Sequence, residues 1–136
     1  MPAIIGISLF GFAYESVRNV NVLRNRYYQN NTIKYTTETE LRTDLDKQIK
    51  LLHLENQTIQ LKYEAIPDFR GGVRGGSGNY TITLHPDYKS RFVIRHELFH
   101  IYRYVNNKIQ NYPLSKYFEE WLATSYAADD NANLKN

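Results

Sequence analysis

The 136-residue chain contains no cysteine, and this absence excludes two kinds of stabilising site. Without thiols the protein forms no disulfide bond, and it cannot build a zinc site from thiolate ligands. Any metal site must therefore use histidine and carboxylate side chains. The length fits a single domain with a modest core, and the absence of cysteine leaves the cellular compartment open.

The sequence also lacks a long apolar run. Its uncharged stretch at residues 2–14 is shorter than the roughly 20 residues that a membrane-spanning helix needs. No basic residue precedes this stretch, as a signal peptide would require, and arginines follow it instead. We expect residues 2–14 to form a buried first element, with a membrane anchor as the alternative. Localisation therefore stays unknown, either cytoplasmic or membrane-associated.

Neither sign of charge dominates the composition. Seventeen basic and fourteen acidic residues give a net charge of +3, and the pI is near 9.0. Two Arg-Gly-Gly steps, at residues 70–72 and 74–76, are of a kind that binds RNA loosely. Two copies are few, however, and a flexible hairpin loop explains the glycines equally well. We therefore do not expect nucleic acid as a partner, and keep a basic glycine-rich binding module as an alternative.

The chain does contain the pentapeptide His96-Glu97-Leu98-Phe99-His100, an H-E-x-x-H motif. One helical turn separates the two histidines, so their imidazoles leave one face of a helix about 6 Å apart at Cβ. This separation suits two ligands of one Zn²⁺ ion. Glu97 points to the side of the metal position, where its carboxylate can take a proton from a zinc-bound water. The motif therefore supplies ligands and a base together.

The residues around the motif predict a helix that is partly buried. Apolar side chains recur there with helical spacing, at Ile94, Leu98, Ile101, Tyr102 and Val105. Two histidines and a glutamate beside such a stripe leave water on folding and need partners. A metal ion is one such partner.

Catalytic zinc usually has three protein ligands, and no histidine follows His100. The H-x-x-G-x-x-H extension of metzincins is therefore absent. Residues 115–128 predict a second helix, in which Glu120 shares a side with two alanines that let another helix approach closely. We favour Glu120 as the third ligand, with Glu119 as the alternative. A broad apolar face is expected elsewhere on this helix, made of Phe118, Trp121, Leu122, Ser125 and Tyr126.

The rest of the chain predicts a small α+β domain. A capping box of Thr37 and Glu40 predicts a helix that runs to about residue 55. Apolar and polar residues alternate at 58–66 and 80–84, which predicts two half-buried strands. Five glycines in the intervening segment predict a mobile loop. We expect residues 1–36 to form an apolar segment and polar connector, and residues 37–136 to form the domain.

The H-E-x-x-H motif at 96–100, followed by E-x-x-A-x-x-Y-A at 120–127, resembles the gluzincin family of zinc metallopeptidases. The short connection between the two motifs is similar to that of minigluzincins and ImmA/IrrE-type peptidases. The resemblance covers about residues 58–128. It implies a zincin-like fold, with a small antiparallel or mixed sheet whose edge strand lies over the zinc helix, and a second glutamate helix. Thr124 departs from the thermolysin-like pattern, which has an aspartate there to hold the first histidine.

The resemblance also implies a function. Zn²⁺ would be held by His96, His100 and Glu120, Glu97 would act as the general base, and a peptide or protein would be the substrate. In this family the edge strand pairs with extended substrate backbone. Here that strand would consist of Tyr80, Thr81, Ile82, Thr83 and Leu84. An inactive zincin that binds a partner without hydrolysis is a further alternative.

Overall fold

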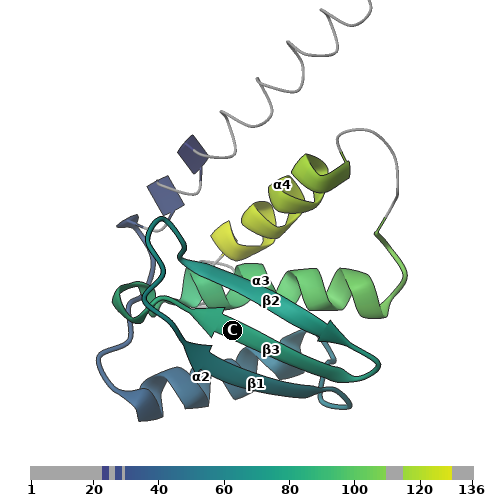
Figure 1. The fold of residues 1–136 in the computed structure, drawn as a ribbon, viewed down its shortest axis with the longest axis horizontal. Helices are drawn as coiled ribbons and strands as arrows, with labels where there is room; N and C mark the ends of the chain where they lie inside the picture. Colours follow the sequence, from purple (N-terminus) through teal and green to yellow (C-terminus); the bar gives the residue numbers. More distant parts are fainter. Residues whose placement is uncertain (1–22, 25–26, 29, 110–114, 130–136) are drawn as a thin grey trace, which may run out of the picture.

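The computed structural model describes residues 23–24, 27–28, 30–109 and 115–129 (Figure 1). Their main elements are α2 (Glu38–Leu51), β1 (Thr58–Tyr63), β2 (Gly71–Gly76), β3 (Asn79–Leu84), the short 3-10 helix η1 (Pro86–Tyr88), α3 (Arg91–Val105) and α4 (Ser115–Ala128). The three strands form one mixed sheet. The α+β class expected from the sequence is therefore confirmed.

The predicted apolar element at residues 2–14 lies outside the described residues. Among the helices that the structure does describe, none is long and apolar enough to cross a membrane.

Helix α2 begins where the capping box predicts. The Thr37 hydroxyl oxygen accepts a hydrogen bond from the backbone N–H of Glu40 at 3.1 Å. The Glu40 carboxylate in turn accepts hydrogen bonds from the backbone N–H and the hydroxyl of Thr36, each at 3.0 Å. The first contact satisfies a backbone donor that the first turn of a helix leaves without a partner, and the other two hold the residue before the cap. The inward face of α2 then adds Leu41 and Leu45 to the core.

Strand β3 lies at the centre of the sheet, parallel to β1 and antiparallel to β2. Its alternate side chains, Tyr80, Ile82 and Leu84, are buried in the core. Because β1 and β2 occupy both of its edges, the β3 backbone has no free edge for a substrate. The prediction of a substrate-binding edge strand is therefore wrong for Tyr80, Thr81, Ile82, Thr83 and Leu84.

The glycine-rich segment predicted as a mobile loop contains a strand that the sequence did not predict, β2. Residues 71–76 form β2, and a two-residue turn of Ser77 and Gly78 joins it to β3. Both turn residues have positive φ, 53° and 86°, as a type I′ hairpin turn requires. Hydrophobic periodicity missed β2 because four of its six residues are glycines without side chains. The Ser-Gly pair followed by an alternating strand is the signal that could have found it.

Helix α3 is the centre of the packing and contacts α2, β2, β3 and α4. Its predicted apolar stripe is confirmed, since Ile94, Leu98 and Ile101 are buried. The hydroxyl of Ser90 caps the helix by accepting the backbone N–H of Val93 at 3.3 Å. In Figure 1, α3 lies along the sheet, and α4 packs against α3.

The buried side of α4 is the side that carries the alanines. Phe118, Trp121 and Leu122 are 41%, 36% and 38% exposed, whereas Ala123 and Ala127 are buried. The prediction that the alanines on the side of Glu120 let another helix approach closely is therefore confirmed. Small side chains lie at the contact between α4 and α3 because they let the two backbones come close, which large side chains would prevent. The same approach brings the adjoining Glu120 toward α3.

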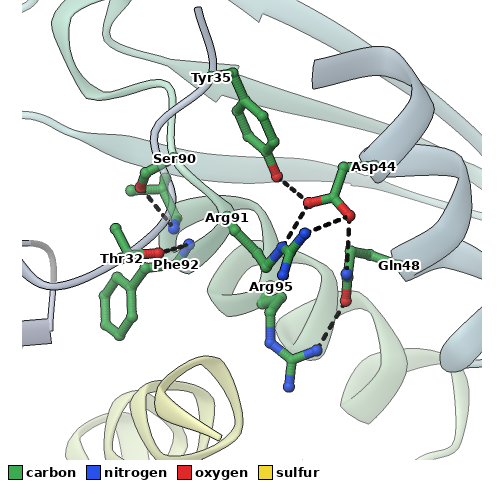
Figure 2. Close-up of polar contacts among 9 residues, drawn as sticks. Thr32, Tyr35, Asp44, Gln48, Ser90, Arg91, Phe92 and Arg95 are labelled. Atoms are coloured by element: carbon green, nitrogen blue, oxygen red, sulfur yellow. Dashed lines mark hydrogen bonds and ion pairs between the residues drawn. The ribbon is translucent and has the colours of Figure 1, made fainter. Parts of the chain in front are cut away.

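Residues just before α2 hydrogen-bond to the start of α3 (Figure 2). The Thr32 hydroxyl accepts the backbone N–H of Phe92 at 3.0 Å, and the Ile33 carbonyl accepts that of Arg91 at 2.9 Å. Lys34 and Ser90 form an antiparallel bridge. This part of the predicted polar connector is thus attached to the helix that carries the H-E-x-x-H motif.

A buried ion pair joins α2 to α3 (Figure 2). Arg91 donates to both carboxylate oxygens of Asp44, from Nε at 2.8 Å and from Nη2 at 3.3 Å. The Tyr35 hydroxyl and the Gln48 amide donate to the same carboxylate. Burial alone would raise the pKa of Asp44, but these hydrogen bonds to its charged form lower it below the ordinary value of 3.8.

Asp44→Asn should lower the free energy of unfolding by about 3 kcal/mol at neutral pH, because Arg91 would be left buried without its anion. A lowered pKa stabilises the folded state above the ordinary value, and this contribution is lost as the pH falls through the folded-state pKa. The difference from wild type should therefore be constant near neutral pH and shrink below about pH 4. Urea unfolding at several pH values measures it, with the exposed Asp46→Asn as control. A difference that does not change with pH would contradict this assignment.

Candidate metal centre

Three side chains from two helices converge at one point. Glu120 of α4 places Oε2 at 2.9 Å from Nε2 of His96, and Oε1 at 3.1 Å from Nε2 of His100. The two Nε2 atoms lie 3.2 Å apart. Zinc bonds of about 2.0–2.1 Å in a tetrahedron separate ligand atoms by roughly 3.3 Å. The spacing and the donor types therefore fit one Zn²⁺ ion, with a coordination position left for water or substrate.

The neighbouring Glu119 takes part in a different contact. Arg103 of α3 donates to both of its carboxylate oxygens, from Nε at 3.0 Å and from Nη2 at 2.6 Å. The side chains of this ion pair are only 17% and 12% exposed. Of the two glutamates that the sequence left open, it is Glu120 that lies with the two histidines. Glu119 instead fixes the first half of α4 to α3.

Thr124 lies behind the first histidine, one turn after Glu120. Its Oγ1 is 3.4 Å from Nδ1 of His96, and the hydroxyl is fully buried. A hydroxyl that accepts the Nδ1 proton leaves Nε2 with its lone pair toward the metal position. Thr124 can therefore orient the His96 ring.

Thr124→Val should weaken zinc binding about tenfold, because it keeps the shape of the side chain and removes the acceptor for His96. Thr124→Ser keeps the hydroxyl and should retain most of the affinity. Competition with a chromophoric chelator measures both constants. Equal zinc affinity in wild type and Thr124→Val would show that the hydroxyl does not orient the histidine.

The two carboxylates near the histidines have opposite electrostatic environments. Burial raises the pKa of Glu97, against the opposing charges of the histidines. Burial would also raise the pKa of Glu120, but hydrogen bonds from His100 and His96 hold it well below its usual range. For His100, burial lowers the pKa, and the Glu120 carboxylate more than reverses this. Glu120 therefore stays ionised at neutral pH, while Glu97 takes up a proton more readily than an ordinary glutamate does.

An open cleft of about 960 Å³ exposes these groups. Its lining includes residues of α3, Glu120 of α4, and Gly71, Gly72 and Val73 of β2. A Cβ atom on Gly71 would lie 2.6 Å from Cγ1 of Val93, so glycine is needed where β2 approaches α3. Within the described residues, β2 has a neighbouring strand on one side only. Of the two edge strands, β1 and β2, it is β2 that lines the cleft, in place of the predicted residues 80–84.

Comparison with known proteins gives no relative for this chain. No family model, no curated protein and no solved structure matches it. Its function is therefore inferred from the H-E-x-x-H spacing and from the contacts of His96, His100 and Glu120.

Proposed function

We propose that this protein is a zinc-dependent peptidase of the gluzincin type. His96, His100 and Glu120 hold the metal ion, and Glu97 is the general base. The observation that carries the proposal is the convergence of the three ligands from two helices, with atom separations of 2.9 to 3.2 Å. Metal sites of this composition with an open coordination position are typical of hydrolytic zinc enzymes.

The residues divide the chemistry among them. Zinc held by this site would supply Lewis-acid activation of a water molecule and of the peptide carbonyl. Glu97 accepts a proton from the attacking water at its carboxylate, and then delivers it to the nitrogen of the leaving amine. Its raised pKa favours this exchange, since an acid–base group works best when its pKa approaches the operating pH. Thr124 keeps His96 in the tautomer that binds metal through Nε2.

The cleft favours an extended peptide as the substrate. Such a peptide can add to the free edge of β2 as a further strand, with hydrogen bonds between main chains. Gly71 and Gly72 keep this part of the wall free of side chains. Main-chain pairing gives affinity with little dependence on sequence, so that specificity depends on the other groups that line the cleft.

Metal analysis together with a cleavage assay tests the proposal. We expect one zinc per purified chain, and cleavage of a diverse peptide library that a chelator stops and added zinc restores. A chain that takes up no zinc when it is supplied would reject the metal site. A chain that binds zinc but cleaves no peptide in the library would favour the inactive zincin.

A further inference from the structure

Arg95, the residue before the first metal-ligand candidate, connects three helices. It lies on α3 and is 1% exposed. Its Nη1 donates to Oε1 of Gln48 on α2 at 2.8 Å (Figure 2). Its Nη2 donates to the carbonyl oxygen of Tyr126 on α4, also at 2.8 Å. The guanidinium carbon lies 4.1 Å from the centroid of the Tyr126 ring, within range of a cation–π contact.

Only a forked, charged side chain can make these contacts together. A buried guanidinium is costly unless its donors are paired, so a residue needed merely to fill the core would be apolar. The planar fork of arginine directs separate N–H groups at two acceptors, which the single ammonium of lysine does not. Gln48 in turn donates to Asp44 at 3.2 Å, and Asp44 pairs with Arg91. Arg95 is thus held in orientation by a polar network that begins on α2.

This contact has a counterpart on the same helix. Arg103 binds Glu119, near the start of α4, while Arg95 binds Tyr126, near its end. Eight residues separate the two arginines, a rise of about 12 Å along α3. Glu120 lies between the two attachment points. The pair therefore fixes both the tilt and the axial position of α4 against the helix that carries the histidines.

We propose that Arg95 is a positioning residue for the metal centre. By tying the second half of α4 to α2 and α3, it sets where the Glu120 carboxylate meets His96 and His100. It acts through the backbone of α4, and none of its described contacts is with the three ligands. The consequence for metal binding rests on the proposed function, whereas the attachment of α4 does not depend on a metal.

Two substitutions separate the forked geometry of the Arg95 guanidinium from its charge. Arg95→Met removes both, and Arg95→Lys keeps the charge but cannot bridge Gln48 and Tyr126. Each should weaken Co²⁺ binding by about tenfold or more, by analogy with other groups that orient ligands. The visible absorption of the Co²⁺ form should also change, because the Glu120 oxygens move relative to the histidines. Leu45→Ala on α2 is the control, since it lowers the melting temperature without altering the attachment of α4.

Hydrogen exchange of the metal-free protein supplies a second measurement. In both Arg95 variants we expect amides of α4 to exchange faster than in wild type, with a smaller change in β3. Leu45→Ala should show no such preference for α4. Should Arg95→Met fail to fold, Arg95→Lys carries the same comparison.

The outcomes distinguish this inference from the proposed function. Wild-type Co²⁺ affinity and spectrum in the Arg95 variants, with α4 exchange like that of Leu45→Ala, would overturn the positioning role. If the wild-type protein binds no Co²⁺, the proposed function fails. The exchange data then still decide whether Arg95 attaches α4. Faster exchange confined to α4 would then support the attachment by Arg95, and uniform exchange would overturn it.

Discussion

Replacing Glu97 by glutamine should lower kcat for peptide hydrolysis by at least about 10²–10⁴-fold, while one zinc still binds per chain. The carboxamide has nearly the same shape but cannot accept the proton of the attacking water. Zinc is retained because Glu97 is not one of the three converging ligand candidates. Elemental analysis and single-turnover cleavage measure the two properties. Activity equal to wild type at full zinc content would refute the role of Glu97 as the base.

The same substitution should raise the stability of the metal-free protein. Burial raises the pKa of Glu97, so the folded state binds its proton more tightly than the unfolded state does. Ionised Glu97 therefore costs stability above its ordinary pKa of 4.5, and glutamine removes this cost. The gain in melting temperature should be present near pH 7 and vanish below about pH 4, where the carboxyl is protonated in both states. Glu55→Gln, at an exposed position, is the control.

Glu120→Ala should abolish high-affinity zinc binding and, with it, hydrolysis. Two histidines on one helix would remain, one ligand fewer than catalytic zinc usually has. The metal-free folded state should persist, because the side chain lies at the cleft and the neighbouring Ala123 and Thr124 keep the packing against α3. Zinc titration beside circular dichroism measures both. Tight zinc binding in this variant would overturn the assignment of the third ligand.

Replacing the adjacent Glu119 by alanine should have the opposite effects: the protein should lose stability but keep zinc binding. It breaks a nearly buried ion pair and leaves Arg103 without its carboxylate, so we expect a loss of about 3 kcal/mol in the free energy of unfolding. Below the lowered melting temperature, zinc binding should persist, because Glu119 is not among the converging ligands. Loss of zinc in Glu119→Ala but not in Glu120→Ala would reverse the two assignments.

Local sequence patterns determined the helices and two of the strands. The capping box at Thr37 predicted the start of α2, because capping depends on residues within one turn. The alternation of apolar residues predicted β1 and β3, and the motif with its apolar flanks predicted α3. The spacing of His96 and His100 on one face is likewise a property of the helix alone. These features needed no knowledge of the rest of the chain.

Tertiary packing decided what the local patterns left open or indicated wrongly. Strand order depends on pairing between distant segments, so neither the central place of β3 nor the free edge of β2 follows from alternation. The glycines of β2 gave no periodic signal at all. The alanines of α4 indicated that a helix could approach there, but only the structure shows that this helix is α3. That approach is also what separates Glu120 from Glu119, two identical side chains at adjacent positions.

The sequence by itself thus determined that two histidines and a glutamate lie together on one helix. Only the tertiary structure decided which carboxylate joins them and what holds it there. The contacts of Arg95 with Gln48 and Tyr126 span 47 and 31 residues of sequence. No local pattern reports such contacts, because a buried charge is specified by partners that the chain brings together only when it folds.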